Sequence, residues 1–166
     1  MKKIIIAISC FFLAFQVSAQ VTKDDIHLMQ ADYAKQKRDL MQEYMKFKNN
    51  ASATEFWKIY DSYEIDRKKL GQDWIANLQD YAKNYGTLTD AKADVLIKKS
   101  GAINTSLEKL YSDYYEKMKK PVGAVTAGQW LQLEAYLQSS LKLSILDQVP
   151  FIGEIERKMS AGKTSK

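Results

Sequence analysis

The chain has 166 residues, with 25 Lys and Arg against 20 Asp and Glu, and a formal net charge of +5. Its hydrophobic content of 46% can form a core, and 27% charged residues is ordinary for a folded soluble domain, so disordered, collagen-like and polytopic membrane classes are excluded. One His and one Cys leave little material for metal sites or thiol catalysis. Two Pro among many Ala, Leu, Lys, Gln and Glu favour helices.

Residues 1–19 have the pattern of a secretory signal peptide. Two lysines precede the apolar run Ile4–Phe15, and the small residues Ser18 and Ala19 follow a polar break, so we expect cleavage after Ala19. Cleavage removes the only Cys and two Lys, which leaves 23 basic against 20 acidic residues and a charge of +3. We therefore expect a periplasmic or secreted bacterial protein with no stable membrane insertion, and the low charge argues against nucleic acid as a partner. An uncleaved anchor helix is the alternative.

Apolar residues recur at three- and four-residue steps in four segments, approximately 24–47, 52–85, 89–120 and 126–149. No segment shows the two-residue alternation of a strand, so we predict an all-α domain over residues 20–153. Short connections make neighbouring helices antiparallel, which predicts an elongated four-helix hairpin or bundle with coiled-coil-like seams. An open arrangement of this kind buries little surface, and a homodimer is one remedy. Residues 154–166 are expected to form a flexible C-terminal tail.

Capping patterns mark where these helices begin and end. Ser52 and Glu55 form a capping-box pattern at the second segment. At the third, Thr89 is a candidate N-cap, Asp90 complements the helix dipole, and Leu88 can pack on the first turn. The basic run before Pro121-Val122-Gly123 predicts a helix stop between the third and fourth segments.

The ionisable residues do not form a recognisable catalytic or metal-binding pattern. His27 is the only His and lies beside two aspartates, whereas a closed zinc site needs about four ligands. The carboxylates alternate with Lys and Arg at helical spacing, as in Glu64 and Lys68, which is typical of a solvated helix face. Phosphate-loop and nucleophile-elbow motifs are missing from the sequence. We expect no enzyme activity, no cofactor and no metal site.

The abundant aromatic residues suggest contact with polypeptide. Successive helical residues diverge by about 100°, so Phe56 and Trp57 cannot both point into one seam, and neither can Tyr114 and Tyr115. Some aromatic surface is therefore left over beside lysines, and exposed aromatic and basic side chains suit polypeptide binding better than catalysis. Our candidate contact residues are Trp57, Lys58, Tyr115 and Lys117.

The order of these features resembles the Spy/CpxP family of periplasmic stress proteins, in which a Leu-Thr-x-x-Gln motif opens helices. Leu88-Thr89 matches the first two positions of that motif, with Lys92 where Gln is expected, and the segment before Ser52 lacks the Leu-Thr pair. The further runs Phe56-Trp57-Lys58-Ile59-Tyr60 and Gln132-Leu133-Glu134 look like a divergent branch of such proteins.

The resemblance implies an ATP-independent chaperone or envelope-stress protein that holds unfolded or partner polypeptides on a helical surface. Two alternatives remain open at the level of sequence. One is a metal-sensing or metal-buffering periplasmic relative, although Met41 and Met45 are the only methionines one turn apart in the predicted helices. The other is a structural coiled-coil protein that binds one specific partner.

Overall fold

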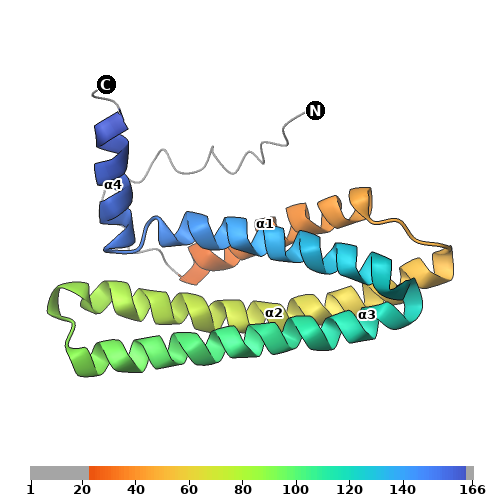
Figure 1. The fold of residues 1–166 in the computed structure, drawn as a ribbon, viewed down its shortest axis with the longest axis horizontal. Helices are drawn as coiled ribbons and strands as arrows, with labels where there is room; N and C mark the ends of the chain where they lie inside the picture. The colour runs from red at the N-terminus through yellow and green to blue at the C-terminus, as the bar shows by residue number, and fades with distance from the viewer. Residues whose placement is uncertain (1–22, 164–166) are drawn as a thin grey trace. The chain divides into compact units, whose positions relative to one another are not determined.

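The structure is a computed structural model that describes residues 23–163, and all regular structure in this range is helical, which confirms the predicted all-α class. Its elements are the helices α1 (Lys23–Tyr44), α2 (Asn50–Asn84), the short 3-10 helix η2 (Tyr85–Thr87), α3 (Asp90–Leu146) and α4 (Ile152–Lys163) (Figure 1). Within this range no helix is both long enough and apolar enough to span a lipid bilayer.

The chain divides into two units, and the boundary lies between Gln36 and Lys37, inside α1. The packing described below belongs to the second unit, which begins at Lys37. The predicted signal peptide, residues 1–19, lies outside the described residues, and the side chain of His27 is also outside them.

Helix α3 changes direction at Gly123, where the predicted stop signal lies. Gly123 has φ 82° and ψ 162°, a conformation that residues with a Cβ rarely adopt. The bend separates a first arm (residues 90–122) from a second arm (residues 124–146), and Pro121 falls in the last turn of the first arm. Both arms lie along α2 (Figure 1), since Tyr114 donates a hydrogen bond to Asp66 at 2.7 Å and Tyr63 donates one to Glu134 at 2.6 Å.

Helix α2 begins earlier than the capping-box pattern predicted. The N-cap is Asn49, which has extended backbone (φ −162°, ψ 170°) and accepts a hydrogen bond from the backbone N–H of Ser52 at 2.9 Å. Asn is as strong an N-cap as Ser, and the chain leaves α1 at Tyr44, so Asn49 is the first residue able to cap the new helix. The assignment of Ser52 as the cap was wrong.

Residues 154–163, which we expected to belong to a flexible tail, are helical and form most of α4. The chain turns at Phe151, whose φ is 74°, and Gly153 then donates its backbone N–H to Val149 O at 2.8 Å. A Cβ at Gly153 would lie 2.6 Å from Asp147 O, so the turn into α4 requires glycine there. A specific turn therefore starts a helix where the sequence predicted fraying.

The core of the second unit is aromatic and is centred on Tyr63. The ring of Tyr63 lies 5.1 Å from Trp130, 5.4 Å from Tyr114, 6.2 Å from Tyr60 and 6.4 Å from Tyr111, measured between ring centroids. The predicted seam residues Phe56, Tyr60 and Trp130 are at most 1% exposed, whereas Trp74, also expected in a seam, is half-buried.

Candidate functional site

Trp57 is half-buried and joins the aromatic core from one side. Its ring contacts Phe56 and Tyr60 edge-on, with centroids 5.1 and 5.3 Å apart. The guanidinium carbon of Arg38 lies 4.7 Å from the Trp57 ring, and Arg38 is also ion-paired with Asp61. A cation–π contact of this kind covers part of the indole. The neighbouring candidate, Lys58, is exposed.

The other two candidate contact residues lie on the first arm of α3. Tyr115 is half-buried, and the Lys119 ammonium lies 5.3 Å from its ring. Lys117 is exposed, and its ammonium lies 4.0 Å from the ring of the buried Tyr114. Among the described residues no ring contact joins Trp57 to Tyr115. The structure therefore places the four candidates as two separate pairs.

The helix-start residues join α2 to α3. Thr89 is the N-cap of α3 and accepts the backbone N–H of Lys92 at 3.3 Å, and Asp90 occupies the first turn. The side chain of Lys92 donates to Asp80 near the end of α2 at 2.7 Å, and this hydrogen bond lowers the pKa of the Asp80 carboxyl. Leu88 is half-buried beside them.

Large apolar side chains are exposed on α2 and on the first arm of α3. Ile65 is 72% exposed, Val95 58% and Ile97 70%. Lysine pairs follow Ile65 and Val95 one helical turn later, so apolar and basic side chains share the same faces. Ile97 lies two positions after Val95 and therefore points to another face of the first arm. We call the whole set the contact surface, and it consists of Ile65, Lys68, Lys69, Val95, Ile97, Lys98 and Lys99.

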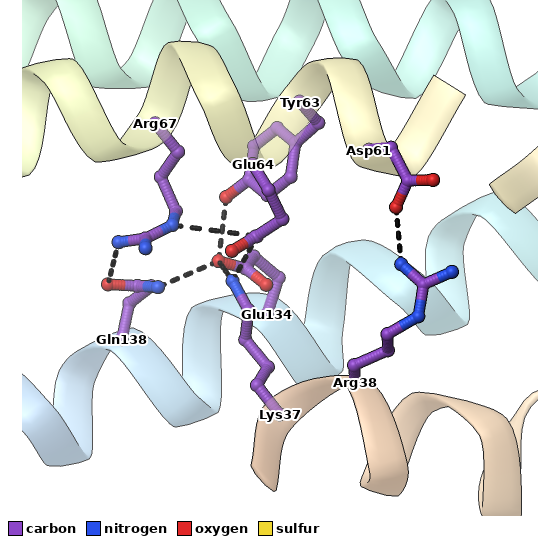
Figure 2. A network of polar contacts seen from close by, with 8 residues as sticks. All are labelled: Lys37, Arg38, Asp61, Tyr63, Glu64, Arg67, Glu134 and Gln138. Atoms are coloured by element: carbon purple, nitrogen blue, oxygen red, sulfur yellow. Dashed lines mark hydrogen bonds and ion pairs between the residues drawn. The ribbon is translucent and has the colours of Figure 1, made fainter. Parts of the chain in front are cut away.

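A network of charged side chains crosses the buried interior, as Figure 2 shows. Lys37 on α1 and Glu134 on the second arm of α3 are both 0% exposed, and the Lys37 ammonium lies 2.9 Å from Glu134 Oε1. Lys37 is also ion-paired with Glu64 on α2, which in turn lies 3.5 Å from Arg67 Nε. The four side chains carry two positive and two negative charges, so the network is balanced.

Glu134 is the centre of this network. Its Oε1 accepts hydrogen bonds from Lys37, from the Tyr63 hydroxyl at 2.6 Å and from Gln138 Nε2 at 2.8 Å, while its Oε2 has no hydrogen-bond partner among the described residues. Burial, and then the negative charge of Glu134, raise the pKa of Tyr63 well above its usual range, so Tyr63 stays a hydrogen-bond donor. The arrangement fastens α1, α2 and the second arm of α3 together at one point.

The buried network holds three helical segments in position. Both carboxylates are matched by a cation. In the part of the chain that the structure describes, His, Cys, Asp and Glu side chains do not gather in groups of three or more that could hold a metal ion.

Sequence reasoning missed the network because it followed apolar residues only. The predicted seam of α1 steps from Tyr33 to Leu40, and that of α2 from Tyr63 to Leu70, each leaving a gap of two helical turns. Lys37 and Arg67 fill those gaps at the inward-facing positions. A charged residue at a seam position on each of several helices is the signal that could have identified the network.

Comparison of the chain with protein-family models, with curated proteins and with solved structures finds no match.

Proposed function

We propose that the protein is an exported, ATP-independent binder of unfolded or partner polypeptides, which acts by contact rather than by catalysis. The observation that carries this proposal is the contact surface, where Ile65 is 72% and Val95 58% exposed and each lies one turn from two exposed lysines. Isolated exposed apolar residues are normal, but their repeated pairing with lysine offers a partly folded chain both apolar and ionic contacts. Each contact is weak, which suits holding and release without nucleotide.

The proposal includes the finer architecture and the location. The two arms of α3 would serve as the third and fourth helices of an elongated antiparallel four-helix arrangement with coiled-coil-like seams. Signal cleavage after Ala19 would deliver the chain to the periplasm or the outside. Trp57 and Tyr115 would add aromatic contacts at the margins of the binding face, in keeping with the resemblance to the Spy/CpxP family.

The test is suppression of aggregation by the purified protein. Light scattering of reduced α-lactalbumin is followed with a few-fold molar excess of protein. We expect slower aggregation, and at least about a threefold weaker effect for the triple variant I65S/V95S/I97S, because solvent-exposed substitutions leave folding almost unchanged. The matched control replaces three exposed polar residues of the same helices, Gln79, Asn104 and Glu108, by Ser.

Unchanged aggregation in the presence of wild-type protein would replace the chaperone proposal by binding to one specific partner. Equal loss of suppression in the triple variant and in the polar control would instead show that the contact surface is not where clients bind.

A further inference from the structure

Helix α4 leaves the apolar side chains of its first two turns in solvent. Between Ile152 and Met159, the part of α4 whose exposure the structure describes, Gly153 is the only buried residue. Ile152 is 37% exposed, Ile155 39% and Met159 54%, and Phe151 just before the helix is 54% exposed. Steps of three and four residues separate these apolar positions, so they lie along one face of the helix. We call this set the α4 stripe, and it consists of Phe151, Ile152, Ile155 and Met159.

The charged residues of this segment divide between its two ends. The acidic residues Glu154 and Glu156 belong to the first half of α4. The pKa of Tyr85 is raised by burial and then by the Glu154 carboxylate, so Glu154 lies near the end of α2. Residues 157–166 contain no acidic residue and four basic ones, which are Arg157, Lys158, Lys163 and Lys166. The α4 stripe is therefore followed directly by a run of positive charge.

We propose that α4 is a peripheral anchor that lies flat on a membrane containing anionic phospholipid. The α4 stripe would enter the boundary between headgroups and acyl chains, and the basic residues would contact the phosphates. A helix with an apolar face and Lys or Arg beside it is the usual form of an interfacial anchor. The 12 residues of α4 span about 18 Å, which is too short to cross a hydrocarbon core of about 30 Å. The helix therefore rests on the surface of the bilayer.

Charge and exposure favour a lipid surface over a polypeptide as the occupant. Four basic residues on and just after an amphipathic helix are typical of anionic-lipid binding. A bilayer surface offers phosphates and acyl chains side by side along the whole helix, and lysine stems can lie on the apolar layer while their ammonium groups reach the phosphates. A bound polypeptide would instead need a second wall beside the stripe, and every residue from Glu154 to Met159 is exposed.

Neither contribution is strong alone. The segment 151–166 carries four basic residues against two acidic ones, which is a modest positive excess. The α4 stripe has four apolar side chains, fewer than a lasting hydrophobic anchor needs. Stable attachment to a membrane generally requires an apolar and a basic signal together, so we expect reversible binding that depends on both and weakens with salt.

The test is co-sedimentation of the purified product, as its host exports it, with vesicles of phosphatidylcholine alone or with about one-third phosphatidylglycerol. The wild type should bind the mixed vesicles at least about fivefold more strongly, and about 0.5 M NaCl should remove this preference. The variant I155S/M159S should bind the mixed vesicles at least about tenfold more weakly, and K158Q/K163Q at least about fivefold more weakly. The variant I155L/M159L keeps the apolar volume and should bind like the wild type.

Matched controls change the same kinds of residue outside α4. The variant V125S/L143S replaces two exposed apolar side chains of the second arm of α3, and K68Q/K69Q replaces two exposed lysines of α2. Both should bind the vesicles like the wild type. Far-UV circular dichroism and the urea midpoint check the folding of every variant. Intact mass establishes that all samples share the same N-terminus, because the apolar run in residues 1–19 would itself bind lipid.

The proposal is overturned if the wild type binds neither kind of vesicle or binds both equally. Unchanged binding in the two α4 serine and glutamine variants, or an equal loss in the controls, would also overturn it. The contact surface lies on α2 and the first arm of α3, so the α4 variants should suppress α-lactalbumin aggregation as well as the wild type does. If they lose that suppression and keep vesicle binding, α4 contacts polypeptide and not lipid. The two proposals can therefore fail independently.

Discussion

Replacing Glu134 by Ala should lower the free energy of unfolding by about 4 kcal/mol, because removal of one partner from a buried ion pair typically costs 3–5 kcal/mol. The change leaves the Lys37 ammonium, which is 0% exposed, with Glu64 as its remaining carboxylate in the network. It also removes the acceptor of the Tyr63 hydroxyl and of the Gln138 amide. For a chain of this size a loss of that magnitude corresponds to a fall in Tm on the order of 10 °C.

Two further variants separate charge from shape. Glu134→Gln keeps a carbonyl oxygen for the three donors and places its amide at Oε2, which has no hydrogen-bond partner among the described residues, so it should cost only about 1–2 kcal/mol. Lys37→Met leaves the Glu134 carboxylate buried without its ammonium. The double variant K37M/E134Q removes both charges, and its loss should be smaller than the sum of the single losses by about 2 kcal/mol.

The measurement is equilibrium urea unfolding, followed by far-UV circular dichroism and by tryptophan fluorescence, since Trp130 is fully buried against Tyr63. Coincident transitions from the two probes justify the two-state treatment. A loss below about 1 kcal/mol for E134A would refute the reasoning, since the change removes one of the two carboxylates of the buried Lys37 ammonium and the acceptor of two further donors. Strict additivity of K37M and E134Q would show that the two side chains do not interact in solution.

Two other changes test the bend and the aromatic core. Gly123→Ala forces a Cβ into a backbone with φ 82° and should cost about 1–2 kcal/mol, whereas Gly101→Ala, in open space within the first arm, should stabilise by about 0.5–1 kcal/mol. The urea midpoint should therefore fall for G123A and rise for G101A. An unchanged midpoint for G123A would contradict the positive φ at the bend. Burial and the hydrogen bond to Asp66 raise the pKa of Tyr114 to about 12, from about 10 in the unfolded chain. The stability that this group contributes is present below about pH 10 and is lost as the pH rises towards 12. The urea midpoint of Tyr114→Phe should therefore fall less steeply than that of the wild type between about pH 9 and 11.5. An identical fall in both proteins would count against this assignment of the pKa shift.

The helical class and most helix positions could be predicted because apolar periodicity is a local signal. The stop at Gly123 and the start after Thr89 were also readable, since glycine, proline and capping residues act on their nearest neighbours. The cap of α2 was misplaced because two candidates three positions apart, Asn49 and Ser52, have nearly equal capping strength. Only the point where α1 ends decides between them, and that depends on packing.

Tertiary features were harder to predict than helices. Lys37 and Glu134 are 97 positions apart in the sequence, and the residues around each one do not identify its partner. The half-burial of Trp57 and Tyr115 agrees with the argument that adjacent aromatics cannot share a seam. That argument could not reveal the Arg38 side chain over the Trp57 ring, because Arg38 belongs to another helix.

The buried network also fixes how the second arm of α3 packs on its neighbours. A seam made only of apolar side chains can slide by one helical turn at little cost, because one methionine or leucine replaces another. A buried ammonium cannot slide in this way, because 5.4 Å of displacement would remove it from the carboxylate 2.9 Å away. The network therefore fixes the register of the second arm against α1 and α2. With its inward face fixed by Glu134, the same arm presents the exposed side chains of its opposite face, such as Val125 and Tyr136, in a defined orientation.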